Sequence, residues 1–195
     1  MAMVLLVREP RKGPRAPAVP GGLFERAVLI PAIIVLLFTF SYGAVTSFVL
    51  LYADERNIAN KGFYFTGFAA AVLVSRLLGG RISDNHGRWA VIVPSLILAI
   101  AAMLVLSIVD SLVLLLTAAA LFGLSFGIGN PATTALAIDL VRPERRGAGM
   151  ATYTSAFEAG IGSGSIVMGI VASFTGYASM FALSAIFPAI ALVIG

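Results

Sequence analysis

Ionisable side chains are few in this 195-residue chain, so the places where they occur are informative. The chain has 13 lysines and arginines, 9 aspartates and glutamates, one histidine, His86, and no cysteine. Disulfides and thiol chemistry are therefore excluded, as is a histidine-rich metal site. The sequence also has no glycine–lysine phosphate-binding loop and no pairing of a nucleophile with a base. We predict that the protein is not an enzyme and uses neither a cofactor nor a metal.

Glu158 is the acidic residue that lies deepest in an apolar stretch. It falls about nine residues after the start of that stretch, roughly 14 Å along a helix at 1.5 Å per residue. Its neighbours at helical spacing are small or polar, namely Thr154, Ser155, Gly162, Ser165 and Gly169. A carboxyl at such a depth costs about 2.5 kcal/mol or more and usually faces a cavity. We interpret Glu158 as a cavity residue that carries a proton, the alternative being a hydrogen-bonded structural acid on a packing face.

A second group of charged residues forms a polar break between two long apolar runs. Its nine residues read Gly80-Arg81-Ile82-Ser83-Asp84-Asn85-His86-Gly87-Arg88. The glycines permit a tight reversal of the chain and a close approach of helices. Asp84 and Arg88 are four residues apart and can pair across one helical turn. The residue types alone allow an interfacial ion pair worth about 0–1 kcal/mol.

The composition defines the elements that must hold these residues. Apolar residues make up 59% of the chain and charged residues only 11%, with a mean hydropathy of +1.01. A helix needs roughly 20 mostly apolar residues to cross a bilayer, and several runs reach that length. These runs are continuous rather than alternating, which makes a closed barrel a poor alternative. We predict an all-α polytopic membrane protein.

Polar breaks divide the chain into an amino-terminal segment and six expected spans. Residues 1–25 contain a short apolar stub followed by a basic linker rich in proline and glycine. The spans are expected at about 26–52, 62–82, 89–109, 112–140, 149–173 and 178–195. The stub at one end and the absence of a polar tail after Gly195 at the other predict that the chain is a fragment.

Lysine and arginine set the expected orientation in the membrane. Eleven of them fall in the linker, the hairpin and the loop after the fourth span, and two fall in the other breaks, Arg56 and Lys61. The positive-inside rule then places both termini and the charged hairpin in the cytoplasm. Because orientation accounts for the positive charge, nothing in it calls for a nucleic-acid partner.

The hairpin pattern Gly80-x-x-x-Asp84-x-x-Gly87-Arg88 resembles the signature cytoplasmic loop of the major facilitator superfamily (MFS) of transporters. The fourth span ends in Asp139 and is followed by Arg142-Pro143-Glu144-Arg145-Arg146-Gly147, which is similar to a second loop of that superfamily. The order of the two motifs resembles a carboxy-terminal half. The resemblance implies six helices arranged as a 3+3 inverted repeat, opposite a missing amino-terminal six-helix half.

The resemblance also implies a function. It predicts a secondary active transporter of a small-molecule substrate, embedded in the cell membrane and working by alternating access. In this superfamily the loop latches a gate, with Asp84 facing a helix of the opposite half and Arg88 pairing with Asp139. The chain is most similar to bacterial proton-coupled efflux proteins for drugs or sugars. The alternatives are a truncated half that does not transport, a membrane scaffold, or a homodimer of halves.

Three polar residues in the spans are candidates for the substrate cavity. Tyr42 and Thr46 share a face of the first span, and the resemblance implies that this helix lines the cavity. Asn130 precedes a proline in the fourth span, so the alternative role is to satisfy a kinked backbone. Arg76, inside the second span, is expected to extend to the headgroups or to pair with Asp139, and anion binding is the less favoured alternative.

Overall fold

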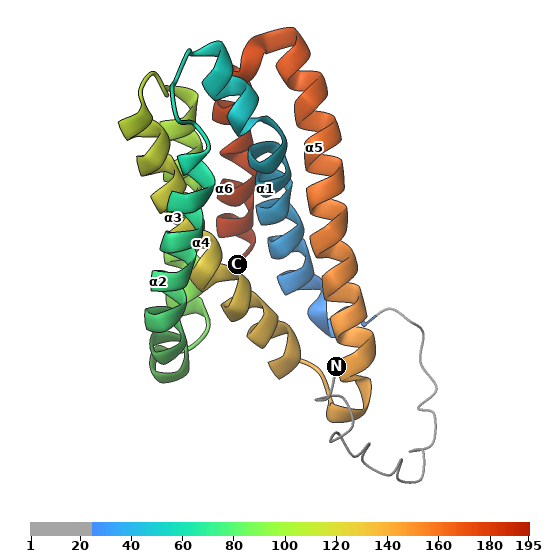
Figure 1. The fold of residues 1–195 in the computed structure, drawn as a ribbon. Helices are drawn as coiled ribbons and strands as arrows, with labels where there is room; N and C mark the ends of the chain where they lie inside the picture. Colours follow the sequence, from blue (N-terminus) through green and yellow to red (C-terminus); the bar gives the residue numbers. More distant parts are fainter. Residues whose placement is uncertain (1–24) are drawn as a thin grey trace, which may run out of the picture.

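The computed structural model describes residues 25–195, apart from the side chains of residues 78–82 and 84. This part of the chain is a bundle of helices, which confirms the predicted all-helical architecture (Figure 1). The long elements are α1 (Leu29–Glu55), α2 (Phe63–His86), α3 (Trp89–Ser107), α4 (Leu112–Asp139), α5 (Arg146–Ser184) and α6 (Ile186–Ile194). Two single 3-10 turns, η2 (Arg26–Val28) and η3 (Pro143–Arg145), precede α1 and α5.

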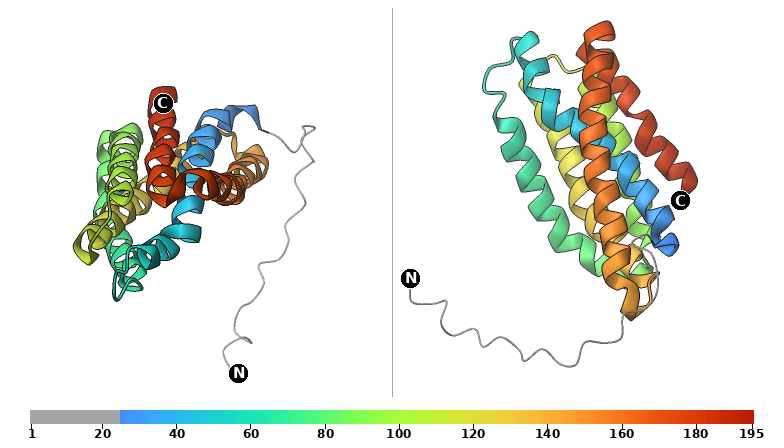
Figure 2. Two further views of the ribbon diagram at one scale, coloured as in Figure 1. Left: turned by 90° about the horizontal axis from the view of Figure 1, so that it is seen from above. Right: turned by 90° about the vertical axis from the view of Figure 1, so that its right-hand side faces the viewer.

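The helix α5 consists of two helices that meet at Gly176. This residue has φ 79° and ψ 165°, a conformation that glycine adopts without the steric cost of a Cβ atom. The chain reverses there, and Figures 1 and 2 show it returning through α6 alongside the bundle. The fifth and sixth predicted spans are thus joined by a one-residue reversal rather than by a loop.

A second interruption separates α5 from α6. Pro188 has no N–H group to donate to the carbonyl of Ser184, four residues earlier. The hydroxyl of Ser41 in α1 donates to that carbonyl oxygen at 2.8 Å. A polar group freed by proline is therefore satisfied within the bundle, as the interior of a membrane requires.

Four helical segments of the described chain are long and apolar enough to cross a membrane. They are Arg26–Glu55, Trp89–Ser107, Leu112–Asp139 and Pro143–Ile194, the last of which contains the reversal at Gly176. The apolar part of α2 is shorter and covers Phe63–Leu77, because charged and polar residues follow it. The chain is a multi-pass membrane protein.

The helix α5 packs most extensively on α1 through two glycines, Gly160 and Gly164. A Cβ atom on Gly160 would lie 2.5 Å from the carbonyl oxygen of Leu36. A Cβ atom on Gly164 would overlap the carbonyl oxygen of Phe40. From the other side, a Cβ atom on Gly43 would overlap the carbonyl oxygen of Ile161. Small residues at such a spacing let two membrane helices touch backbone to backbone.

The helices α2 and α4 form a second close pair. A Cβ atom on Gly123 would lie 2.5 Å from the carbonyl oxygen of Phe68, and one on Gly127 would lie 2.8 Å from that of Val72. The hydroxyl of Ser125, between these glycines, turns to α3 and donates to the carbonyl oxygen of Ser95 at 2.6 Å. The helix α4 is therefore fixed between α2 and α3.

Replacing Gly164 by alanine should lower the free energy of unfolding by about 1–3 kcal/mol, because the new Cβ has no space against the backbone of Phe40. The check is unfolding of the purified protein in detergent. Gly162→Ala is the matched control, since no neighbouring atom lies within 4 Å of a Cβ built there. It should be neutral or slightly stabilising, and an equal loss in both variants would contradict the packing argument.

Candidate functional site

The charged turn between α2 and α3 is shorter than the sequence predicts. The helix α2 continues to His86, and only Gly87 and Arg88 separate it from α3. Polar residues such as Asn85 and His86 are compatible with a helix, and the chain turns at Gly87, where φ is 89°. Gly80 lies within α2 and is not part of the turn, contrary to the prediction that it permits the reversal. The side chain of Asp84 lies outside the described residues, so its predicted role remains a prediction.

The side chain of Arg88 joins the ends of two helices. Its Nε donates to Oδ2 of Asp139 at 3.0 Å, and its Nη1 donates to the hydroxyl of Ser83 at 2.9 Å. Asp139 is the last residue of α4, where a carboxylate opposes the negative end of the helix dipole. The guanidinium of Arg88 compensates that charge. Because both side chains are partly exposed, such a pair contributes about 1 kcal/mol or less.

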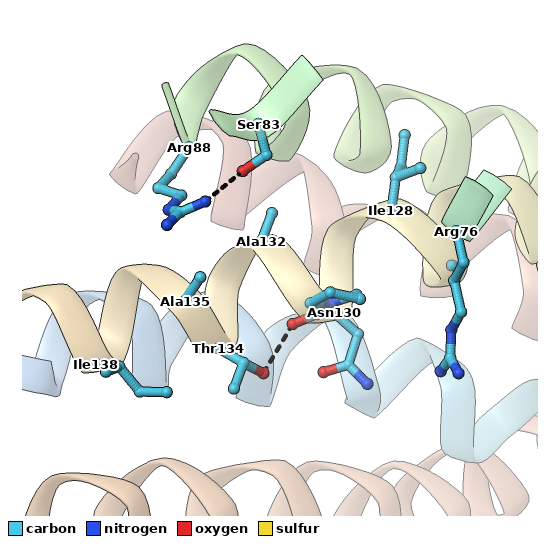
Figure 3. Close-up of a pocket in the computed structure, with 11 residues that line it drawn as sticks. Arg76, Ser83, Arg88, Ile128, Asn130, Ala132, Thr134, Ala135 and Ile138 are labelled. Atoms are coloured by element: carbon cyan, nitrogen blue, oxygen red, sulfur yellow. Dashed lines mark hydrogen bonds between the residues drawn. The ribbon is translucent and has the colours of Figure 1, made fainter. Parts of the chain in front are cut away.

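An open pocket of about 730 Å³ lies against α2 and α4 (Figure 3). Its lining includes two guanidinium groups, of Arg76 and Arg88. Asn130 and Thr134 of α4 add polar groups, and Ile128, Ala132 and Ile138 add apolar ones. Figure 3 shows Arg76, Asn130 and Thr134 pointing to the same side of α4. The described lining residues include no acid.

Tyr153 of α5 holds the polar side of α4 in place. Its hydroxyl lies 2.8 Å from that of Thr133 and 3.2 Å from that of Thr134, and it donates to Oδ1 of Asn130 at 3.4 Å. Sequence analysis did not single out Tyr153. The available signal was the polar face of α4, where Asn130, Thr133 and Thr134 stand at helical spacing and need a partner.

Arg76 does not form the ion pair that was expected for it. Asp139 accepts from Arg88, and among the described residues no acid lies within ion-pair distance of Arg76. The reason is geometric, because Arg76 stands near the middle of α2 and Asp139 is at the end of α4. Arg76 is exposed on the pocket instead.

Tyr42 and Thr46 lie on α1, and neither is among the described residues that line the pocket. The ring of Tyr42 stacks on Phe126 at 4.9 Å and on Phe122 at 6.1 Å between centroids. The hydroxyl of Thr46 donates to the carbonyl oxygen of Tyr42 at 3.0 Å. The structure thus places Tyr42 in an aromatic cluster and leaves Thr46 bonded within its own helix.

Glu158 is exposed on α5, on a face that turns away from α1. The glycines that contact α1 are Gly160 and Gly164, whereas Gly162 has open space beside it. The carboxyl of Glu158 has no hydrogen bond or ion pair to any other described residue. Within the described chain Glu158 is thus neither buried nor hydrogen-bonded.

A second charge pair forms at the same end of the bundle, where α1 and α5 begin. Oε2 of Glu25 accepts from Nε of Arg145 at 2.7 Å, and the backbone N–H of Glu25 donates to the hydroxyl of Thr152 at 3.1 Å. The hydrogen bond from Arg145 lowers the pKa of the Glu25 carboxyl below its usual value. These contacts fasten the chain that enters α1 to the start of α5.

A helical bundle whose described part contains four membrane-length segments, with a pocket against α2 and α4 that is lined by two arginines, defines a class of multi-pass membrane protein. The family model of the Major Facilitator Superfamily matches residues 31–195. The chain belongs to this superfamily, whose members are transporters rather than enzymes.

Relatives among known proteins agree with this membership. An uncharacterized MFS-type transporter of Burkholderia mallei (strain SAVP1) is 29% identical over 145 residues, which cover 74% of this chain and 36% of that protein. An uncharacterized MFS-type transporter of Pseudomonas aeruginosa (strain LESB58) is 28% identical over 140 residues. The chain therefore spans about a third of the length of these relatives.

Solved structures show the same fold. A peptide transporter (POT) in complex with sulfate matches with a TM-score of 0.74 and 21% identity, covering 91% of this chain and 39% of that one. A POT family transporter in complex with 5-aminolevulinic acid matches with a TM-score of 0.76 and 19% identity, covering 87% and 37%. At this level of identity the likeness concerns the fold alone.

Replacing Glu25 by glutamine should lower the melting temperature at pH 7 and flatten its pH dependence. The folded-state pKa of Glu25 is below the usual value of 4.5. The ionised carboxyl therefore makes its full contribution to the stability of the folded protein above pH 4.5. This contribution is lost as the pH falls through the folded-state pKa. The difference between wild type and Glu25→Gln should therefore shrink below about pH 4.5. Thermal unfolding between pH 3 and 8 measures it.

Glu144→Gln is the control for this measurement, since Glu144 is adjacent to Arg145 in the chain but exposed. It should leave the pH profile unchanged. A difference between wild type and Glu25→Gln that stays constant across the whole range would contradict the assigned ion pair.

Proposed function

We propose that the chain forms one six-helix half of a secondary active transporter that moves a small solute by alternating access. The second half packs opposite it, and the solute binds between the two. Membership of the superfamily supports this function. The two close helix pairs also support it. In an inverted repeat of three helices, α4 corresponds to α1 and the first part of α5 corresponds to α2. The pair α1–α5 is then the counterpart of the pair α4–α2, and both pack through glycines.

The observation that carries the proposal is the contact of Arg88 with Asp139 at 3.0 Å. It couples the α2–α3 turn to the end of α4, so that a movement of either affects the other. In this proposal Asp84, near the end of α2, meets a helix amino terminus of the opposite half, which stabilises a carboxylate by about 0.3–1 kcal/mol. We infer that Arg88, Asp139 and Asp84 latch one gating state, with Gly87 shaping the turn and Gly80, inside α2, allowing a neighbouring helix to approach closely.

Glu158 is proposed as the proton-coupling residue, because an exposed carboxyl on a membrane helix requires a polar environment. The opposite half would supply that environment as an aqueous cavity. In this proposal the protein lies in the cell membrane with both termini in the cytoplasm, as the distribution of arginine requires. Transport runs outward, with a drug or sugar exchanged for a proton.

Asp139→Asn should reduce the transport rate about tenfold without changing the amount of protein in the membrane, because it removes the charge that Arg88 binds. The measurement is substrate efflux from cells that express the complete transporter, normalised to protein level. The variant Arg88→Gln should have a similar effect, and the double variant should be no worse than either. Asp84→Asn should also impair turnover. Additive losses in the double variant would show that the residues act separately.

Glu158→Gln should abolish the dependence of transport on the proton gradient, because the amide cannot carry a proton. Transport is compared in vesicles with and without an imposed pH gradient. Glu55→Gln is the control, since Glu55 ends α1 outside the apolar spans. If Glu158→Gln retained full proton dependence, Glu158 would not be the coupling residue. If the wild-type protein moved no solute at all, the chain would instead be a scaffold or an inactive half.

A further inference from the structure

Arg76 is the cation in the described chain whose position is hardest to explain by packing. It lies about ten residues before the end of α2, which is roughly 15 Å at 1.5 Å per residue. It is the last residue but one of the apolar part of α2, Phe63–Leu77, and ionisable residues within membrane helices usually pair with one another or face a polar cavity. No described acid pairs with Arg76, whereas the pocket beside α4 includes it in its lining.

The position of Arg76 is fixed by the close contact of α2 with α4. A Cβ atom on Gly127 would overlap the hydroxyl of Ser75, the residue that precedes Arg76. Gly127 itself lines the pocket. The backbone that carries Arg76 is therefore held directly against α4, and its guanidinium points to the same side as Asn130 (Figure 3).

Asn130 presents hydrogen-bond donors to the same space. The hydroxyl of Tyr153 donates to Oδ1 of Asn130, so the amide nitrogen is left to donate elsewhere. No described residue accepts from that nitrogen. A guanidinium with five N–H donors and an amide with two thus line the same pocket, and among the described lining residues no acid opposes them.

We propose that this pocket binds the anionic group of the transported solute, a carboxylate, sulfonate or phosphonate, with Arg76 as its ionic partner and Asn130 as a second donor. The guanidinium matches two oxygens of such a group in a forked arrangement. Ile138, which lines the pocket on the same side of α4 as Asn130, would contact the uncharged part of the molecule (Figure 3). This assignment of substrate class rests on the proposed transport function.

Arg88 is a separate group in the same pocket. It is held by Asp139 and Ser83, so its charge is already balanced. An anion at Arg76 would lie in the same pocket as the latch without replacing a partner of Arg88. The pocket therefore links the binding residue on α2 with the latch at the end of the same helix.

The test measures binding without requiring transport. The protein that carries this chain is purified in detergent, and its melting temperature is titrated with three anions, acetate, benzoate and benzenesulfonate, each paired with its neutral amide. At least one anion should stabilise the wild-type protein and its amide should not. Arg76→Gln should weaken that anion at least tenfold, about 1.4 kcal/mol at 25 °C. Arg76→Lys should retain part of the affinity because it keeps the charge.

Arg56→Gln is the matched control. Arg56 is an exposed arginine that follows the last residue of α1, where it lies over the ring of Tyr52, and it does not line the pocket. This variant should bind the anion as wild type does. Equal stabilisation by acids and amides, unchanged affinity in Arg76→Gln, or no anion binding at all would overturn the assignment. If the wild-type protein bound the anion but transported no solute, the proposed function would be contradicted, whereas the assignment of an anion site to this pocket would stand.

A second arm distinguishes a solute from a lipid headgroup. The titration is repeated in nanodiscs that contain phosphatidylglycerol, whose phosphate has the same recognition chemistry. A solute site should give the same anion affinity in nanodiscs as in detergent. Loss of anion binding in the presence of this lipid would assign the pocket to the headgroup and overturn the solute proposal.

Discussion

Gly160 and Gly164 let α5 lie directly against the backbone of α1, and Gly123 and Gly127 do the same for α4 against α2. Lipid tails are as apolar as leucine, so burial of apolar surface does little to hold these helices together. Close packing and interhelical hydrogen bonds must do so instead. The remaining features follow from these two contacts, because the Gly127 contact brings Arg76 into the same pocket as Asn130 and the α5 contact brings Tyr153 to α4.

Two charge pairs, Arg88 with Asp139 and Glu25 with Arg145, lie at the end of the bundle where α1, α3 and α5 begin. Each pair is partly exposed, so each is weak enough to open during a conformational cycle. The close-packed glycine contacts, in contrast, leave no space for the paired helices to move against each other. The structure thus combines rigid helix pairs with a polar end that can rearrange, which suits a half that moves as a body against its counterpart.

The hydropathy of the sequence was sufficient to predict an all-helical membrane protein, because an apolar environment leaves the backbone few alternatives. Motifs around Arg88 and Asp139 were sufficient to predict the superfamily. The shape of the breaks was less predictable. Gly176 reverses the chain in one residue, and the helix before Gly87 continues to His86, because a single positive φ replaces a longer loop.

The sequence by itself determined which residues carry charge inside apolar stretches, namely Arg76 and Glu158, since composition alone makes them exceptional. Only the tertiary structure decided what surrounds them. Which face of α5 meets α1 depends on where Gly160 and Gly164 find a complementary backbone, and Gly162 looks the same in the sequence. The sequence offered two arginines as partners of Asp139, Arg88 through the family resemblance and Arg76 through its charge. The fold selects Arg88 because the end of α4 meets the turn between α2 and α3.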